Sequence, residues 1–327
     1  MRMLQKSLLA IGVSMIVGAV AAALPTASYA QWEPEKPVEF IIMAGKGGGA
    51  DKMARLMQTL VEKNGWSSKP LTPINKPGGS GAEALVHLKH TSDPNHSIMV
   101  TLNSFYTTPL RQPKLEVDIA TFSPIARMAE DTFLLWVHKD SGITNIDEFV
   151  AAAKAAGPDW IMAGTGKLQE DQLLTDFLNA AYGLDMTYVP YKGGGKVAKQ
   201  LAGKHANSTV NNPSEQEGFY ANGDTVPLAA FTSERLEMFP DAPTFGELGK
   251  DFVYFMQRSV VGAPGMSDGA QAYYAELFKK VYDSPEWTEY RKKKSLQGDF
   301  LSGDALKQYW MNERDIHRAM LTEMGAL

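Results

Sequence analysis

Short apolar runs that end in glycine or in a polar pair recur along the chain, and most precede a stretch with helical periodicity. Residues 38–43 form the first run and lead into Gly45-Lys46-Gly47-Gly48-Gly49, after which apolar side chains recur at helical spacing from Met53 to Val61. The same patterns predict further strands at 97–102, 133–137, 160–163 and 187–191. They predict helices at 51–63, at 146–156, around 173–178, at 270–282 and at 304–324, and one more that follows 193–195 and extends to 203.

Strands that alternate with helices predict an α/β protein with a mostly parallel sheet covered on both faces. Two glycine-rich turns between a strand and a helix, at 45–49 and 193–195, lie about 145 residues apart. We therefore expect two α/β lobes that face one another.

The first thirty residues have the pattern of a secretory signal. Arg2 and Lys6 are the only charges before Glu33, and residues 7–24 are uncharged and mostly apolar. Ser28-Tyr29-Ala30 supplies the small residues that signal peptidase requires at positions −3 and −1, so we expect cleavage after Ala30 and an exported, soluble mature chain. The alternative is an uncleaved anchor, since eighteen apolar residues just span a bilayer.

Composition excludes several functional classes. The chain has 327 residues with 37 acidic and 32 basic groups and no basic tract, which argues against nucleic acid as a partner. The absence of cysteine excludes disulfides, thiolate metal sites and cysteine nucleophiles. A mean hydropathy of −0.22 excludes a polytopic membrane protein.

The glycine turns have the composition of anion sites. Glycine lets a ligand approach the main chain, and a loop just before a helix aims several N–H groups and the positive end of the helix dipole at one point. The turns at 45–50 and 193–195 have this form, and 164–166 is a weaker version. The alternative is a turn selected only for its geometry. We expect Asp51 to cap the first turn of the 51–63 helix with its charge turned away, direct ligand contact being the alternative.

Other chemistry lacks a motif. No lysine stands in a Walker frame, and Gly45-x-Gly47-x-x-Ala50 fits only the loose dinucleotide fingerprint. His87 and His90 share a helix face near His96, which predicts a solvated edge rather than a metal site. No Gly-x-Ser-x-Gly elbow is present. The sequence therefore predicts no catalytic constellation, no metal and no cofactor.

Several motifs in order resemble the solute-binding proteins of tripartite tricarboxylate transporters, the Bug family. They cover essentially the whole mature chain. The motifs are the opening strand with its glycine triplet (36–51), Asn75-Lys76-Pro77-Gly78-Gly79-Ser80-Gly81-Ala82, Val189-Pro190-Tyr191-Lys192-Gly193-Gly194-Gly195, Asp241-Ala242-Pro243-Thr244-Phe245-Gly246-Glu247-Leu248-Gly249 and Ala263-Pro264-Gly265.

The resemblance implies a type II periplasmic binding protein with two α/β lobes, a ligand cleft between them and two crossing segments. The expected divisions are a signal peptide at 1–30, one lobe at 31–132 together with 258–327, and a second lobe at 133–257. The ligand-binding residues that the resemblance implies are Lys46, Gly47, Gly48, Gly49, Ala50 and Asp51 in the first lobe loop, Tyr191, Lys192, Gly193, Gly194 and Gly195 in the second, and the strand ends Asn103, Ser104, Gly164, Thr165, Asn211 and Asn212.

The implied function is periplasmic capture of a small organic carboxylate, a di- or tricarboxylate or an aromatic acid, and its delivery to the membrane subunits of such a transporter. We expect a monomer without catalytic activity. The alternatives are an exported enzyme that acts on a carboxylate and a sensor that docks a signalling receptor. Many relatives have a proline or phenylalanine run where this chain has Ala44-Gly45-Lys46. Lys46, Lys167 or Arg258 would favour a diacid if it pointed into the cleft.

Overall fold

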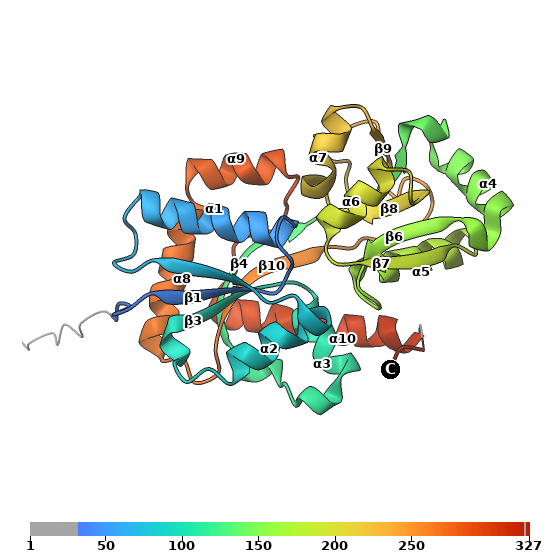
Figure 1. Cartoon of the computed structure of the whole chain (residues 1–327). Helices are drawn as coiled ribbons and strands as arrows, with labels where there is room; N and C mark the ends of the chain where they lie inside the picture. The colour runs from blue at the N-terminus through green and yellow to red at the C-terminus, as the bar shows by residue number, and fades with distance from the viewer. Residues whose placement is uncertain (1–31, 324) are drawn as a thin grey trace, which may run out of the picture. The chain divides into compact units, whose positions relative to one another are not determined.

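The structure, a computed structural model, describes residues 32–323 and 325–327 (Figure 1). The predicted signal peptide and its cleavage point lie outside the described residues. Among the described helices, none combines the length and the apolar character that a membrane crossing needs.

The first of two five-stranded sheets has the order β2-β1-β3-β10-β4. Its strands are β1 (Val38–Ile42), β2 (Leu71–Asn75), β3 (Ser97–Thr101), β4 (Ser123–Asp131) and β10 (Met256–Gly262). Helices cover both faces of this sheet (Figure 1). They are α1 (Gly49–Lys63), α8 (Asp268–Tyr282) and α9 (Pro285–Lys293) on one face, and α2 (Ala82–Lys89), α3 (Ser104–Arg111) and α10 (Gly303–Glu323) on the other.

The alternation of side chains along β1 supplies a core to each face. Phe40 and Ile42 pack in the cluster under α1 and α8, whereas Ile41 and Met43 pack in the cluster under α2 and α3. All four side chains are at most 3% exposed. Successive strand residues point to opposite faces, so an uninterrupted apolar run is the sequence that a strand covered on both sides requires.

The second sheet has the order β7-β6-β8-β5-β9. Its strands are β5 (Leu134–His138), β6 (Ile161–Thr165), β7 (Thr187–Tyr191), β8 (Ser208–Asn211) and β9 (Thr225–Ala230). The helices around it are α4 (Ile146–Ala156), α5 (Glu170–Tyr182), α6 (Gly194–Ala202) and α7 (Pro213–Ala221). The protein is therefore an α/β protein with two lobes, as the sequence predicts.

Each of the two described sheets is mixed: four of its five strands run in one direction, in agreement with the prediction of a mostly parallel sheet, and one strand runs against them. β10 runs antiparallel to β3 and β4, and β5 runs antiparallel to β8 and β9. Each of these two strands enters its sheet from a connection with the other lobe, because β5 follows β4 and β10 follows the segment after β9. The strand-to-helix units that the sequence reveals are parallel, but a strand inserted from a distant segment carries no local sign of its direction.

The antiparallel strands β4 and β10 are neighbours in the first sheet. The chain leaves this sheet after β4 and returns to it at the start of β10. Met256 and Gln257 pair with Asp131 and Glu130 in the first sheet. The predicted lobe limits at 132/133 and 257/258 remain a proposal. Helix α10 also contributes to both lobes, since Trp310 packs in the first-lobe core and Leu321 in the second-lobe core.

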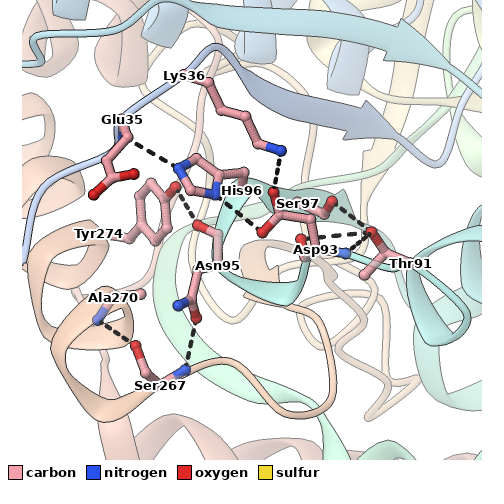
Figure 2. A network of polar contacts seen from close by, with 10 residues as sticks. All are labelled: Glu35, Lys36, Thr91, Asp93, Asn95, His96, Ser97, Ser267, Ala270 and Tyr274. Carbon is pink, nitrogen blue, oxygen red and sulfur yellow. Dashed lines mark hydrogen bonds and ion pairs between the residues drawn. The ribbon is translucent and has the colours of Figure 1, made fainter.

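A polar network joins the first described residues to α8 (Figure 2). His96 contacts Asp93 at 3.0 Å and accepts from the Glu35 backbone N–H at 3.2 Å, and Lys36 pairs with Asp93 at 2.6 Å. The Asn95 backbone carbonyl accepts from the Tyr274 hydroxyl at 2.8 Å. His96 therefore helps to hold the segment that leads into β1. Among residues 32–323 and 325–327 no trio of histidine and acidic side chains is arranged to hold a metal ion.

Candidate functional site

A cavity of about 390 Å³ has walls from both lobes. Its volume lies within the range of small-molecule sites. The segments that line it follow the carboxyl ends of β1, β2 and β3 in the first lobe and of β6, β7 and β8 in the second. Ligands of α/β sheets bind outside the carboxyl ends of the strands, so the topology itself marks this cavity as the candidate site.

The first glycine loop opens α1 without any side-chain cap. Gly48 occupies the N-cap position, and Gly47 has φ of 81°, a conformation that favours glycine. Gly48, Gly49 and Ala50 line the cavity. Lys46 is exposed and does not line it, so the suggestion that Lys46 meets a second carboxylate loses its support.

Asp51 stabilises this loop rather than capping the helix. Its Oδ2 accepts the Gly47 N–H at 2.9 Å, and its Oδ1 accepts from Arg55 and Asn75, both at 3.0 Å. Burial raises the pKa of Asp51, but these hydrogen bonds outweigh it and the net pKa is lowered. The predicted cap is therefore wrong, although the charge is turned away from the cavity as expected, because Asp51 does not line it.

The second glycine loop lies against the first. Gly193 has φ of 91° and Gly194 begins α6. A Cβ added to Gly195 would lie 3.4 Å from the Gly47 carbonyl oxygen, and one on Gly45 would lie 3.9 Å from the Lys192 carbonyl oxygen. The loops of the two lobes therefore approach each other through backbone.

A carboxylate of the protein, that of Glu215, lies at the starts of α1 and α6. Glu215, in the first turn of α7, packs directly on Gly194, accepts from Asn211 Nδ2 at 2.9 Å and faces the Gly49 backbone N–H. Burial raises the pKa of Glu215, and the hydrogen bond from Asn211 opposes this. The sequence interpretation overlooked Glu215, although an acid just after the predicted strand end at 211–212 was a signal that could have found it.

A third glycine turn, between β2 and α2, also lines the cavity. Its residues Gly79, Ser80 and Gly81 have φ of 61°, 56° and 90°. The Thr108 hydroxyl holds the turn by donating to the Ser80 carbonyl at 2.6 Å. Gly81 has no room for a side chain, since a Cβ would lie 2.9 Å from Met43 Cγ. The sequence analysis used this motif for the family resemblance but did not assign it to the site.

Arg258 brings a buried ion pair to the cavity wall. Arg258 and Asp131 are 3% and 1% exposed, and Arg258 Nε donates to Asp131 Oδ2 at 3.0 Å. The guanidinium packs against Gly49, where a Cβ would lie 2.8 Å from Nη2. Burial raises the pKa of Asp131, and the Arg258 charge opposes the rise.

Two more carboxyl groups line the cavity from the first turn of α5. Glu170 and Asp171 are each 3% exposed. Asp171 Oδ2 accepts the Thr165 N–H at 2.8 Å, whereas Glu170 Oε1 is buried without a hydrogen-bond partner within the described part of the chain. Burial raises the pKa of both groups, that of Asp171 well above its usual range with a further contribution from the Glu215 charge.

The structure brings part of the predicted set together. The predicted residues that line the cavity are Gly48, Gly49, Ala50, Thr165, Tyr191, Lys192, Gly193, Gly194 and Asn212. Those that do not line it are Lys46, Gly47, Asp51, Asn103, Ser104, Gly164, Gly195 and Asn211. Asn103 is buried in a network with Tyr254, His317 and the Gln257 N–H, so its amide group serves the protein interior. Lys167 is exposed and outside the cavity.

Gly164 supports the acidic part of the wall, and replacing it with alanine is expected to lower the free energy of unfolding by about 1–3 kcal/mol. The new Cβ would lie 2.5 Å from Tyr188 Cε2 and 2.7 Å from Asp171 Cβ, so strand and helix must separate. Urea denaturation measures the change. Gly218→Ala inside α7 is the matched control: no atom of the described residues lies within 4 Å of its Cβ position, so it should raise the free energy of unfolding by about 0.5–1 kcal/mol. Equal stability of Gly164→Ala and the wild type would contradict this packing.

Comparison with protein families gives a match over most of the chain. The model of the tripartite tricarboxylate transporter family receptor matches residues 57–325. A UPF0065 protein from the gbd 5′ region of Cupriavidus necator is 24% identical over 305 residues, covering 93% of this chain and 92% of that protein. BugT of Bordetella pertussis is 23% identical and covers 73% of this chain and 72% of its own.

Solved structures show the same fold at low sequence identity. The periplasmic binding protein BugD superposes with a TM-score of 0.82 at 20% identity, over 90% of this chain and 99% of its own. An R. palustris protein solved with adipate has a TM-score of 0.81 at 20% identity, over 89% and 98%. MatC from Rhodopseudomonas palustris, solved with malate, has a TM-score of 0.77 at 20% identity, over 88% and 99%. The two-lobe fold is thus that of periplasmic binding proteins.

Proposed function

Because this chain belongs to the tripartite tricarboxylate transporter receptor family, we propose that it captures a small organic carboxylate in the periplasm and delivers it to the membrane subunits of such a transporter. The observation that carries the proposal is the cavity between the lobes, walled by glycine turns at the carboxyl ends of the strands. Relatives of the same fold were solved with adipate and with malate, which supports a carboxylate as the solute.

Backbone amides at helix starts supply the anion-binding chemistry. Glu215 already lies at the starts of α1 and α6, and Glu83 accepts the Gly78 N–H at 3.1 Å in the turn before α2, so we assign the solute carboxylate to the remaining backbone N–H groups of the glycine turns around the cavity. Hydrogen bonds to a charged group contribute about 1.5–3 kcal/mol each. A few of them account for micromolar affinity, which corresponds to about −8 kcal/mol.

Contacts between the lobes supply a closed state that a solute can favour. Lys52 Nζ of α1 donates to the Ser214 carbonyl of the second lobe at 2.9 Å, and the two glycine loops meet through backbone. A ligand shifts the equilibrium between open and closed lobes only by its differential affinity for the two. A solute held by both walls gains its full set of contacts only on closure, and we propose that the transporter recognises this form.

The proposal includes export through the predicted signal peptide and action as a monomer without catalysis. The family is one of receptors that work with a transporter. An exported enzyme acting on a carboxylate, or a sensor docking a signalling receptor, are the alternatives. Analysis of recovered solute after incubation separates the first, because a binding protein returns its ligand unchanged.

Thermal unfolding with a panel of aliphatic and aromatic carboxylates tests the proposal. A ligand present at 100 times its Kd adds about 2.7 kcal/mol of apparent stability, which raises the Tm. We expect at least one acid to raise the Tm and its amide to have no effect. If no acid in the panel raises the Tm of ligand-free protein, the carboxylate proposal is wrong.

A further inference from the structure

Arg111 connects the two lobes beside the cavity. It is the last residue of α3 in the first lobe, and its Nη1 donates to the Lys167 backbone carbonyl of the second lobe at 3.0 Å. Lys167 lies in the loop between β6 and α5, and this loop lines the cavity through Thr165, Gly166 and Gln169. Arg111 does not line the cavity itself. It therefore contacts a wall segment of the opposite lobe from outside the solute space.

The same side chain is tied to the first-lobe wall. Arg111 Nη2 lies 3.5 Å from Thr108 Oγ1, one turn earlier on α3, and that hydroxyl donates to the Ser80 carbonyl at 2.6 Å. Gln112, the next residue along the chain, donates from Nε2 to the Gly79 carbonyl at 3.3 Å. Gly79 and Ser80 belong to the glycine turn that lines the cavity. A chain of polar contacts centred on Arg111 therefore runs from the wall of one lobe to the wall of the other.

Both ends of this chain hold strained backbone. Ser80 has φ of 56°, and Leu168, which follows Lys167, has φ of 55°. Residues other than glycine adopt this conformation at a cost, and it persists only where neighbouring contacts impose it. At Leu168 these contacts are the bond of its N–H to Gln172 Oε1 at 2.8 Å and the bond of Arg111 to the preceding carbonyl. Arg111 thus helps to set the shape of the second-lobe loop.

Arg111 lies away from the segment that crosses back to the first lobe. That segment is fixed at the opposite end of α3, where Asn103 donates to the Phe255 carbonyl and accepts the Gln257 N–H, both at 2.9 Å. The eight residues of α3 separate the two ends by about 12 Å. A contact at this distance from a crossing segment breaks when the lobes rotate apart about it. The bond between Arg111 and the Lys167 carbonyl therefore belongs to the closed form.

We propose that Arg111 is the positioning residue that couples solute capture to lobe closure, because its bond to the Lys167 carbonyl holds the second-lobe loop against the first-lobe glycine turn. The inference rests on the proposed function and names a residue that retains the solute without touching it. A guanidinium stays protonated in proteins, so the bond is charge-assisted. Its acceptor is a neutral carbonyl on the main chain, which no side-chain substitution at Lys167 removes.

The distance between two spin labels measures closure. The chain has no cysteine, so Lys114→Cys in the first lobe and Asp185→Cys in the second, both exposed, supply the attachment points. We expect the ligand-free protein to contain a closed population. Arg111→Met keeps the apolar stem and removes the donors, and it should lower the ratio of closed to open molecules about 10- to 100-fold, the effect of one charge-assisted hydrogen bond.

Two further variants serve as controls. Arg235→Met removes an arginine whose bonds to Glu247 and to the Pro240 carbonyl stay within the second lobe, so the distance distribution should not change. Arg111→Lys keeps a cationic donor without the forked geometry and should restore part of the closed population that Arg111→Met loses. A closed population in Arg111→Lys no larger than in Arg111→Met overturns the role of the hydrogen bond.

Binding kinetics separate positioning from damage to the site. The probe is the acid that raises the Tm most in the thermal-unfolding panel, followed by stopped-flow fluorescence. Arg111→Met should raise its dissociation rate constant about 10- to 100-fold. The association rate constant should change far less, because the solute enters the open form. A lower association rate constant with an unchanged dissociation rate constant overturns the inference.

The outcomes keep the two proposals apart. If no acid raises the Tm, the carboxylate proposal is wrong, and the label distances still show whether Arg111 holds the lobes closed. Equal distance distributions in wild type and folded Arg111→Met overturn the inference and leave the carboxylate proposal standing where an acid binds. Should Arg111→Met fail to fold, Arg111→Lys decides, since a closed population equal to that of wild type overturns the inference.

Discussion

Replacing Arg258 with methionine is expected to lower the free energy of unfolding by about 3–5 kcal/mol. The substitution keeps much of the side-chain volume but leaves the Asp131 carboxylate without its cationic partner in a position that is 1% exposed. Asp131 Oδ1 already lacks a hydrogen-bond partner among residues 32–323 and 325–327, so little is available to replace the guanidinium. Removing one member of a buried pair costs far more than the pair contributes, because the remaining charge stays desolvated.

Chemical denaturation of the purified variants measures this loss. Arg235→Met is the control, since Arg235 pairs with Glu247 at 3.0 Å while both side chains are 46% exposed, and such pairs contribute at most about 1 kcal/mol. The double variant Arg258→Met with Asp131→Leu removes both charges and should recover much of the stability. Arg258→Met and Arg235→Met with equal losses would show that the buried pair has no special role.

Stability should fall by about 3 kcal/mol through His317 alone as the pH decreases from 6.5 to 4. His317 is 1% exposed, and burial lowers its pKa to about 4, while the hydrogen bond to the Glu313 carbonyl acts in the opposite direction. That carbonyl accepts from Nδ1 at 2.8 Å, so Nδ1 carries the hydrogen and Nε2 is the acceptor for the Tyr254 hydroxyl at 2.9 Å. The folded protein therefore holds a neutral imidazole.

The direction of this change in stability follows from proton uptake at His317. Between pH 6.5 and 4 the unfolded chain binds a proton at His317 and the folded chain does not, so unfolding becomes more favourable as the pH falls. Each unit of pKa difference corresponds to about 1.4 kcal/mol. The contribution of neutral His317 to the free energy of unfolding is fully present above pH 6.5 and is lost by pH 4.

Unfolding free energies of wild type and His317→Gln, measured at several values between pH 7 and pH 4, test this prediction. Titrating groups that do not contact His317 contribute alike to both curves and cancel in the difference, whereas the Glu313 carboxyl, 3.7 Å from His317 Nδ1, is removed as a second variable by repeating both measurements in a Glu313→Gln background. The curves should converge by about 3 kcal/mol toward low pH. His90→Gln is the control, because His90 is exposed, and its curve should run parallel to that of wild type. Parallel curves for His317→Gln would mean that the imidazole is not neutral in the fold.

Local sequence was sufficient for most of the units that form the cavity, with β2 and β8 as the exceptions. The run at 38–43 and its glycine loop became β1 and the start of α1, and Thr187–Tyr191 was predicted at its observed limits. Helix α4 also has its predicted bounds. Asp51 was misassigned because the helix begins at Gly49, so Asp51 lies inside the first turn and accepts the N–H of Gly47, four residues upstream in the loop.

The strand β10 shows where local information ends. All its residues are buried, but Gln257, Arg258 and Ser259 interrupt its apolar pattern, and the sequence analysis predicted no strand there. Its antiparallel direction and its place between β3 and β4 depend on the route of the whole second lobe.

The sequence by itself determined the α/β class, the two glycine loops and the family, because strand periodicity, helix periodicity and glycine turns are properties of neighbouring residues. Only the tertiary structure decided the charge of the cavity. Arg258 meets Asp131 across 127 positions, and the carboxyl groups of Glu170 and Glu215 join one wall from different helices. Burial and pairing of such groups depend on segments that only the folded chain brings together.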